Sequence, residues 1–304
     1  MDTIFTQVRK KSKTEFIIPR IIQLSGYLSI LYVSLISLFL LKEGFPTLYN
    51  VPFDSIFGKY WYPIESYYSI WPLILGSITV MIGAAIIAVP LGIGTGVYIS
   101  EIAPQWAKEI LKPIVEILAG VPSVVLGFIG IQVIVPFIRE SFNLPTGLTA
   151  LTGSILLGWA AIPTIVSITE DSLNTVPASY RQASLALGAT PWQTIWGATL
   201  PAARSGVITA VMLGIGRVIG ETMTVMMVTG NAPVMPMGLQ AVFSPVRTMT
   251  ATIASEMGEV ATGSVHYQVL FFIGIILFLF SLTINLIAFL VSFRIIKRSE
   301  RLLS

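Results

Sequence analysis

The chain has 304 residues, of which 54% are hydrophobic and 11% are charged, and its mean hydropathy is +0.83. Soluble domains average about 25% charged residues, so this composition excludes an ordinary soluble domain and indicates an integral membrane protein. The sequence holds no cysteine, which excludes disulfides, thiolate metal sites and cysteine nucleophiles. The net charge of +3 is attributed to membrane topology, and no nucleic-acid surface is expected.

Six apolar runs are long enough to cross a bilayer core, which needs about 20 helical residues. They lack the ten-residue alternation of a membrane barrel, so they predict an all-α fold with six transmembrane helices. The first run is too long for a signal-peptide core and no small-residue cleavage site follows it, so we expect a retained anchor. The runs are Ile21–Leu41, Trp71–Ile99, Ile114–Ile138, Leu148–Ile168, Gly206–Val228 and Val269–Val291.

Lysine and arginine predict the orientation, because they accumulate in short cytoplasmic loops. With the N-terminus inside, thirteen of these residues are cytoplasmic, and only Lys42, Lys59, Arg139 and Arg247 lie outside. Both termini are therefore predicted to be cytoplasmic. The expected layout is a cytoplasmic tail at 1–20, a first transmembrane helix at 21–41, an extracytosolic loop at 42–70, a transmembrane domain at 71–293 with a cytoplasmic loop at 170–204, and a cytoplasmic tail at 294–304.

The first outer loop is rich in aromatic residues, which are typical of an interfacial belt at headgroup depth. The second outer segment, Gly230–Gln268, could cap a pathway or dock a partner. Its histidine, His266, has no second ligand at helical spacing, so we interpret it as a solvated loop residue and expect no metal site. The belt residues are Tyr60, Trp61, Tyr62, Tyr67, Tyr68 and Trp71.

The cytoplasmic loop before the fifth run is predicted to form a helical hairpin. Pro177 can begin a helix through Ala178–Leu187, and Gly188 is suited to a left-handed stop. Thr190 then caps a second helix, with Gln193 completing a capping box. The exposed apolar side chains of this hairpin invite a partner, or they lie on the membrane surface or pack under the bundle, and their spacing leaves these readings open. These side chains are Leu185, Leu187, Trp192, Ile195 and Trp196.

The fifth run contains Arg217 and Glu221 in an otherwise uncharged stretch. A charge at the bilayer centre costs roughly 2.5–3.5 kcal/mol on insertion scales, so such groups usually face a bundle interior, a partner charge or a solute pathway. Residues four apart share one face of a continuous helix, and we expect the two side chains to pair. The pair either orients the helix or lines a pathway. Glu116, near the cytoplasmic end of the third run, is expected to be structural.

The sequence Arg181–Pro201, RQASLALGATPWQTIWGATLP, resembles the EAA loop of importer-type ABC permeases. That pattern is Glu-Ala-Ala, three residues, Gly, nine residues, Ile, one residue, Leu-Pro. Here Gly188, Leu200 and Pro201 are in register, whereas the Glu, the second Ala and the Ile are replaced by Gln182, Ser184 and Ala198. Four further stretches between residues 45 and 293 resemble PstC-type subunits of the Pst phosphate importer. They are SEIAP (100–104), LAGVPSVVLGFIG (118–130), SITEDSL (167–173) and GRVIGETMTVMMVTGN (216–231).

The resemblance implies a type I ABC importer permease in a bacterial or archaeal inner membrane, surrounded by lipid. Its implied partners are a homologous PstA-like permease, a PstB-like ATPase dimer and an extracytosolic PstS-like phosphate-binding protein. The chain has no Walker motif, so it is not expected to be an enzyme or to bind a cofactor, and ATP and Mg²⁺ are used by the partner ATPase. The implied ATPase-coupling residues are Arg181, Gln182, Ala183, Ser184, Leu187, Gly188, Ala189, Leu200 and Pro201.

The resemblance also gives the charged residues of the fifth run a role on the substrate path. Arg217 supplies a planar fork of donors for a tetrahedral oxyanion. Glu221 holds that fork and accepts the proton-bearing hydroxyl of hydrogen phosphate, which sulfate lacks at neutral pH. Ser123 and Thr222 offer additional hydroxyls.

Three other functions are compatible with these observations. The chain could serve an importer of another oxyanion, such as molybdate or sulfate. It could be a proton-coupled carrier in which Glu221 titrates, although such a carrier should lack the EAA hairpin. It could also be a membrane regulator that senses phosphate, which would keep the hairpin but need no continuous pathway.

Overall fold

The computed structural model describes residues 13–303 and is mostly helical. Within that range, six helices are long and apolar enough to cross a membrane, which confirms the predicted number. Of the two predicted tails, residues 1–12 and 304 lie outside the described residues. The spans are Ile18–Asn50, Trp71–Ile102, Ser123–Ser141, Ala150–Asn174, Pro191–Gly220 and Val265–Ile287.

The elements follow one another along the chain with short connections, and η marks a 3₁₀ or π turn. In order they are α1 (Lys13–Gly44), α2 (Thr47–Asn50), α3 (Phe53–Ile56), β1 (Trp61–Tyr62), η1 (Pro63–Glu65), β2 (Tyr67–Tyr68), α4 (Trp71–Val97), η2 (Tyr98–Ile102), α5 (Gln105–Ala119), α6 (Ser123–Ile129), η3 (Gly130–Ile134), α7 (Val135–Ser141), α8 (Ala150–Asn174), α9 (Ala178–Ala186), α10 (Pro191–Thr194), η4 (Ile195–Thr199), α11 (Leu200–Gly220), α12 (Met223–Val228), η5 (Leu239–Phe243), α13 (Met249–Glu256) and α14 (Val265–Leu303).

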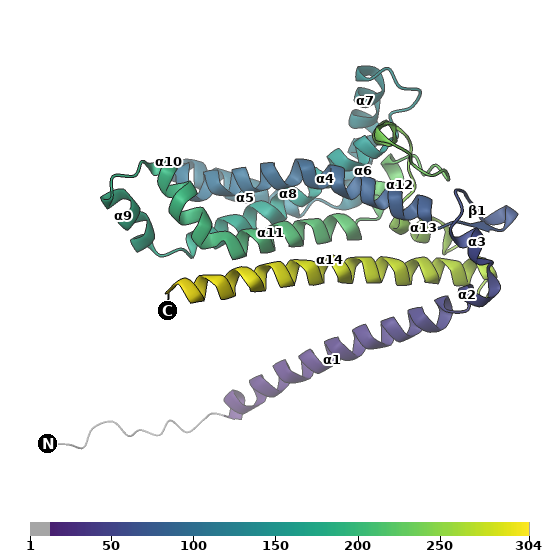
Figure 1. The fold of residues 1–304 in the computed structure, drawn as a ribbon, viewed down its shortest axis with the longest axis horizontal. Helices are drawn as coiled ribbons and strands as arrows, with labels where there is room; N and C mark the ends of the chain where they lie inside the picture. Colours follow the sequence, from purple (N-terminus) through teal and green to yellow (C-terminus); the bar gives the residue numbers. More distant parts are fainter. Residues whose placement is uncertain (1–12, 304) are drawn as a thin grey trace.

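The long helices run along one axis, so the molecule has two distinct ends (Figure 1). The start of α1, the end of α14 and the hairpin of α9, α10 and η4 lie at one end, which we call the hairpin end. The antiparallel ribbon of β1 and β2 lies with α13 at the other, the ribbon end. The described start and end of the chain, at α1 and α14, thus lie toward the same end of the molecule as the hairpin. That this end is cytoplasmic stays a prediction from the charges.

Helices α4, α8 and α11 form the core, which is centred on buried residues such as Ala84, Leu157 and Ala210. Glycines allow the helices to approach closely, as is usual where lipid supplies no hydrophobic drive between helices. Gly92 of α4 lies directly against Ile165 of α8. By contrast, α1 contacts α14 near the ribbon end and diverges from the bundle toward its start (Figure 1).

The predicted third helix, Ile114–Ile138, is interrupted in the structure. Helix α5 ends at Ala119, and a new helix starts at Ser123 after a turn at Gly120 and Val121. Pro122 adopts an extended conformation, with φ −60° and ψ 137°, and a proline also disfavours helical geometry in the residue before it. The amphipathic α5 therefore lies before the membrane span, and Glu116 is an exposed residue of α5.

The predicted fifth helix, Gly206–Val228, is wrong at both ends. The span begins at Pro191, so the second helix of the hairpin runs directly into α11. It ends at Gly220, because Glu221 is extended, with φ −72° and ψ 129°. A short α12 then resumes. The single helix face that was expected to carry two charges four residues apart does not exist.

The aromatic belt prediction is wrong for two of its members. Trp61 is only 1% exposed and Tyr68 is also buried, and both belong to a cluster with Leu73, Val269 and Leu270. Burial raises the pKa of the Tyr68 hydroxyl. The remaining rings, Tyr60, Tyr62, Tyr67 and Trp71, are exposed. The outer ribbon is therefore anchored to the bundle by its alternate aromatic side chains.

The contact of α4 with α8 can be tested at two glycines of one helix. A Cβ on Gly92 would lie 2.6 Å from Ile165 Cγ2, whereas a Cβ on Gly94 would meet no atom within 4 Å. Overpacking of this kind costs about 1–3 kcal/mol. We expect Gly92→Ala to lower the free energy of unfolding in detergent by that amount and Gly94→Ala to leave it unchanged or higher. Equal effects of the two substitutions would contradict this packing.

Candidate functional site

The two helix breaks face each other within the membrane domain. The Thr224 hydroxyl of α12 donates to the Ser123 carbonyl at the start of α6, over 3.0 Å. Arg217 Nη2, near the end of α11, donates to the Ala119 carbonyl at the end of α5, over 3.3 Å. Backbone groups freed by an interrupted membrane helix need such partners, because hydrocarbon offers none. The chain thereby brings four irregular helix ends together at one junction.

Arg217 is held at this junction by neutral oxygen atoms. Besides the Ala119 carbonyl, its Nη1 donates to the Thr164 hydroxyl of α8 over 3.3 Å. Both distances are at the long limit for N–H···O bonds. Within residues 13–303, neither Arg217 nor Glu221 forms an ion pair, so the predicted pairing is wrong. The extended backbone at Glu221 is the reason, because it ends the helical spacing that would align them.

Glu221 faces a different set of neighbours. Its carboxylate lies 3.5 Å from the Thr224 hydroxyl, whose proton is donated to the Ser123 carbonyl, and its backbone carbonyl accepts from the Thr250 hydroxyl over 3.1 Å. It also lines a cavity of about 20 Å³ with Ser77 of α4 and Thr248 beside α13. A cavity of this volume has room for one water molecule, and its polar lining offers the partners a water needs.

The structure places the two predicted hydroxyl residues at the same junction. Ser123 is half-buried at the start of α6. Thr222, also half-buried, follows Glu221, and its hydroxyl donates to the Gly220 carbonyl over 3.3 Å. All four predicted path residues therefore lie in one region. Arg217 and Glu221, however, do not form the ion pair that the sequence suggested.

The hairpin has the local geometry predicted for it. Gly188 has a φ of +85°, and both bonds of the capping box between Thr190 and Gln193 are formed. A bond of 3.0 Å from the Thr194 hydroxyl to the Ser184 hydroxyl closes its two arms. The prediction of an exposed apolar face is confirmed with one correction, since Ile195 is buried. The exposed residues of this face are Leu185, Leu187, Trp192 and Trp196.

The predicted coupling residues divide into a tip and a base. Gln182, Ala183, Leu187 and Gly188 are exposed at the tip, and Leu187 is 90% exposed. At the base, Leu200 packs on the cluster of Leu173, Val176, Ala203 and Val207, while Pro201 is exposed in the first turn of α11. Ala189 is half-buried between them. Arg181 points toward the bundle and bonds Glu101, a residue that the sequence reasoning missed.

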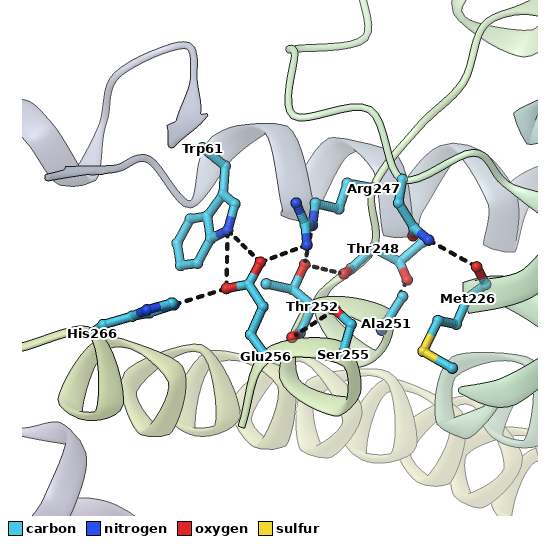
Figure 2. Close-up of polar contacts among 10 residues, drawn as sticks. Trp61, Met226, Arg247, Thr248, Ala251, Thr252, Ser255, Glu256 and His266 are labelled. Atoms are coloured by element: carbon cyan, nitrogen blue, oxygen red, sulfur yellow. Dashed lines mark hydrogen bonds and ion pairs between the residues drawn. The ribbon is translucent and has the colours of Figure 1, made fainter. Parts of the chain in front are cut away.

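A second polar cluster that the sequence did not reveal lies at the ribbon end (Figure 2). Glu256, the last residue of α13, accepts bonds from Trp61 Nε1 at 3.0 Å and from Arg247 Nη2, and His266 Nε2 lies 2.8 Å from its carboxylate. It thus ties the ribbon, the loop before α13 and the first turn of α14 together. His266 is part of this cluster, so its interpretation as a solvated loop residue is wrong. No group of three potential ligands suited to a metal occurs among the described residues.

Six spans, helix breaks just before the third span and just after the fifth, and a helical hairpin that runs into the fifth span are the features of the transmembrane subunit of a type I ABC importer. Solved structures of the MetNI methionine ABC transporter in inward-facing conformations share this fold. One of them aligns with a TM-score of 0.57 and 19% sequence identity over 74% of this chain and 97% of that chain. Residues 88–298 match the binding-protein-dependent transport system inner membrane component family. The chain belongs to that family, and it is a multi-pass inner membrane protein whose class leaves ATP hydrolysis to a separate subunit.

Comparison with individual curated relatives is more specific than the family match. The probable ABC transporter permease protein YqgH of Bacillus subtilis is 43% identical over 246 residues, which are 80% of this chain and 79% of the relative. The phosphate transport system permease protein PstC of Pasteurella multocida is 32% identical over 269 residues, 82% of each chain. PstC of Mesorhizobium japonicum is 30% identical over 300 residues, 92% of this chain and 90% of the relative.

The cluster at the ribbon end predicts a large effect of one carboxylate on stability. The side chains of Glu256 and Arg247 are both only 16% exposed, and removing one partner of a buried pair costs about 3–5 kcal/mol. We expect Glu256→Gln to lower the free energy of unfolding in detergent by about 3 kcal/mol. Glu259→Gln, at an exposed position three residues further on, is the control and should change it by less than about 0.5 kcal/mol. A Glu256→Gln protein as stable as this control would show that the cluster is not structural.

Proposed function

We propose that this chain is a permease subunit of an ATP-driven phosphate importer. The observation that carries the proposal is the guanidinium of Arg217, held by long bonds to two neutral oxygens at the junction of two helix breaks. Two relatives that match most of the chain are phosphate transport system permeases by name.

The binding strength of such a site follows from its partners. A phosphate oxygen carries more negative charge than a carbonyl or hydroxyl oxygen, so charge-assisted bonds from Arg217 to phosphate would be stronger than its present bonds. The substrate would replace acceptors that Arg217 holds weakly, and those acceptors would regain the arginine when the substrate leaves. A transport site has to bind loosely enough to release its solute. No carboxylate in the described residues pairs with Arg217, so no ion pair has to break first.

Selectivity would come from Glu221 near the same junction. Hydrogen phosphate can donate its hydroxyl proton to this carboxylate, whereas sulfate at neutral pH has no proton to donate and is repelled. Thr222 and Ser123 would add hydroxyls to the route. Because Glu221 and Arg217 do not pair, they would not form a single binding clamp. Instead, each side chain would contact the oxyanion separately, either at the same time or one after the other along a path.

The partners follow from the two ends of the molecule. The exposed tip of the hairpin, with Leu187 and Trp192, would dock into the ATPase dimer on the cytoplasmic side. Both termini would then be cytoplasmic as well. ATP and Mg²⁺ would be bound by that dimer. A homologous permease would complete the path, and a phosphate-binding protein would deliver the solute at the ribbon end.

The proposal is tested by uptake of radiolabelled phosphate into vesicles that hold the reconstituted complex. Arg217→Gln should reduce ATP-dependent uptake about 10- to 100-fold, because a hydrogen bond to a charged group contributes about 1.5–3 kcal/mol. Arg139→Gln removes an exposed cation of α7 and should transport like the wild type. Normal uptake by Arg217→Gln would remove Arg217 from the path.

Competition with other oxyanions tests the role of Glu221. We expect sulfate to compete poorly with phosphate in the wild type and at least about tenfold better in Glu221→Gln, which removes the repelling charge. Preferred transport of sulfate or molybdate by the wild type would assign a different oxyanion. Uptake driven by a pH gradient without ATP would indicate a proton-coupled carrier, and an assembled complex without any flux would indicate a sensor.

A further inference from the structure

Arg181 belongs to the hairpin, but its side chain does not point toward the hairpin's exposed surface. Arg181 donates from Nε to Glu101 over 3.0 Å, and Nη2 reaches the other oxygen of the same carboxylate. Nη1 donates to the Val176 carbonyl over 2.8 Å, and Nη2 also donates to the Leu173 carbonyl over 2.9 Å. Its donors are therefore directed into the bundle, where they cap the end of α8, and a docked partner would meet the neighbouring residues instead.

The carboxylate that receives Arg181 is nearly enclosed. The side chain of Glu101 is 8% exposed, and that of Arg181 is 26% exposed. A buried carboxylate without a partner is strongly unfavourable, so its bonds confine the arginine to this position. The hydrogen bond to Glu101 raises the pKa of Arg181, which therefore stays charged at any physiological pH. This ion pair joins the hairpin to the segment around Glu101, although the two residues are 80 positions apart in the sequence.

Glu101 belongs to η2, the turn that connects α4 to α5. The adjacent Ser100 donates to Asn174 over 2.9 Å, and Asn174 donates to Glu170 over 2.8 Å. Glu170 in turn pairs with Lys112 of α5, over 3.0 Å, and this hydrogen bond raises the pKa of the Lys112 ammonium. An unbroken series of polar contacts thus runs from the corner of η2 along the end of α8 and onto α5.

Helix α5 connects this corner with the candidate substrate site. It has 15 residues and so spans roughly 22 Å at 1.5 Å per residue. Its last residue is Ala119, whose carbonyl accepts from Arg217. One end of α5 is therefore linked through Glu101 to the hairpin, and the other end supplies an acceptor to the arginine of the helix breaks.

We propose that Glu101 is a positioning residue that fastens the hairpin to α5, so that a displacement of the hairpin moves α5 and changes the contact between Ala119 and Arg217. The inference rests on the proposed function, in which the hairpin contacts the ATPase and Arg217 contacts the substrate. Glu101 touches neither. Its role is to transmit a displacement of the hairpin through Arg181 and η2 to α5.

The first test is the amount of phosphate taken up per ATP hydrolysed by the reconstituted complex. Glu101→Gln keeps the shape of the side chain but removes its charge, so we expect an assembled complex that hydrolyses ATP with uptake per ATP lowered about tenfold. Glu101→Asp keeps the charge and should recover part of the ratio. The control is Glu109→Gln, which removes an exposed carboxylate of α5 and should keep the wild-type ratio. An unchanged ratio in Glu101→Gln, or a loss of uptake and hydrolysis in equal proportion, would overturn the proposal.

A second measurement does not depend on phosphate. The chain has no cysteine, so spin labels at Ala186→Cys in the hairpin and Ile117→Cys in α5 are unique within it. Both positions are exposed. In complexes whose partner subunits lack cysteine, we expect one narrow distance distribution in each nucleotide state, broadened by Glu101→Gln and not by Glu109→Gln. A distance distribution between the two labels that Glu101→Gln leaves unchanged would refute the link between the hairpin and α5. A narrow distribution in a complex that does not transport phosphate would refute only the proposed substrate.

Discussion

The interior of this protein depends on how the backbone groups at two helix breaks are satisfied. Hydrocarbon provides no hydrogen-bond partners, so an interrupted span is stable only where protein groups or trapped water bind the freed carbonyls. Here Thr224 donates to Ser123, Arg217 to Ala119 and Thr250 to Glu221. Arg217, which we propose to contact the oxyanion, is thus also one of the side chains that satisfy the backbone at these breaks. The proposed function and the structure share this arginine at the junction.

The scaffold around the breaks is rigid because α8 is held along most of its length. Close approach at Gly92 joins it to α4, while Gly214 brings α11 against the same residue, Ile165. From this scaffold α8 presents Thr164 to Arg217 in the middle of the molecule and Glu170 to Lys112 at the hairpin end. Helix α8 thus contacts its neighbours both in the middle of the molecule and at the hairpin end. Because α8 is fixed, α5 and the hairpin can be displaced relative to it.

Features that depend on local sequence were predictable and features that depend on distant contacts were not. The number of spans follows from hydropathy, and the capping box at Thr190 follows from residues within one turn. Prolines are ambiguous, since Pro90 and Pro163 lie inside continuous helices whereas Pro122 starts a new one. The expected pairing of Arg217 with Glu221 assumed an unbroken helix and failed with it. Glu101 and Glu256 find partners far away in the sequence, beyond the reach of any local pattern.

The distribution of bond strengths suggests which parts of the chain move. At each end a carboxylate, Glu101 or Glu256, holds a guanidinium and fixes several segments together. In the middle, the described residues offer Arg217 two neutral oxygens at the long limit of hydrogen bonding. In the proposed importer, alternating access would require ends that transmit force without loosening and a centre that exchanges partners at low cost. Strong ion pairs at the periphery and weak, replaceable contacts at the breaks meet both requirements within one polypeptide.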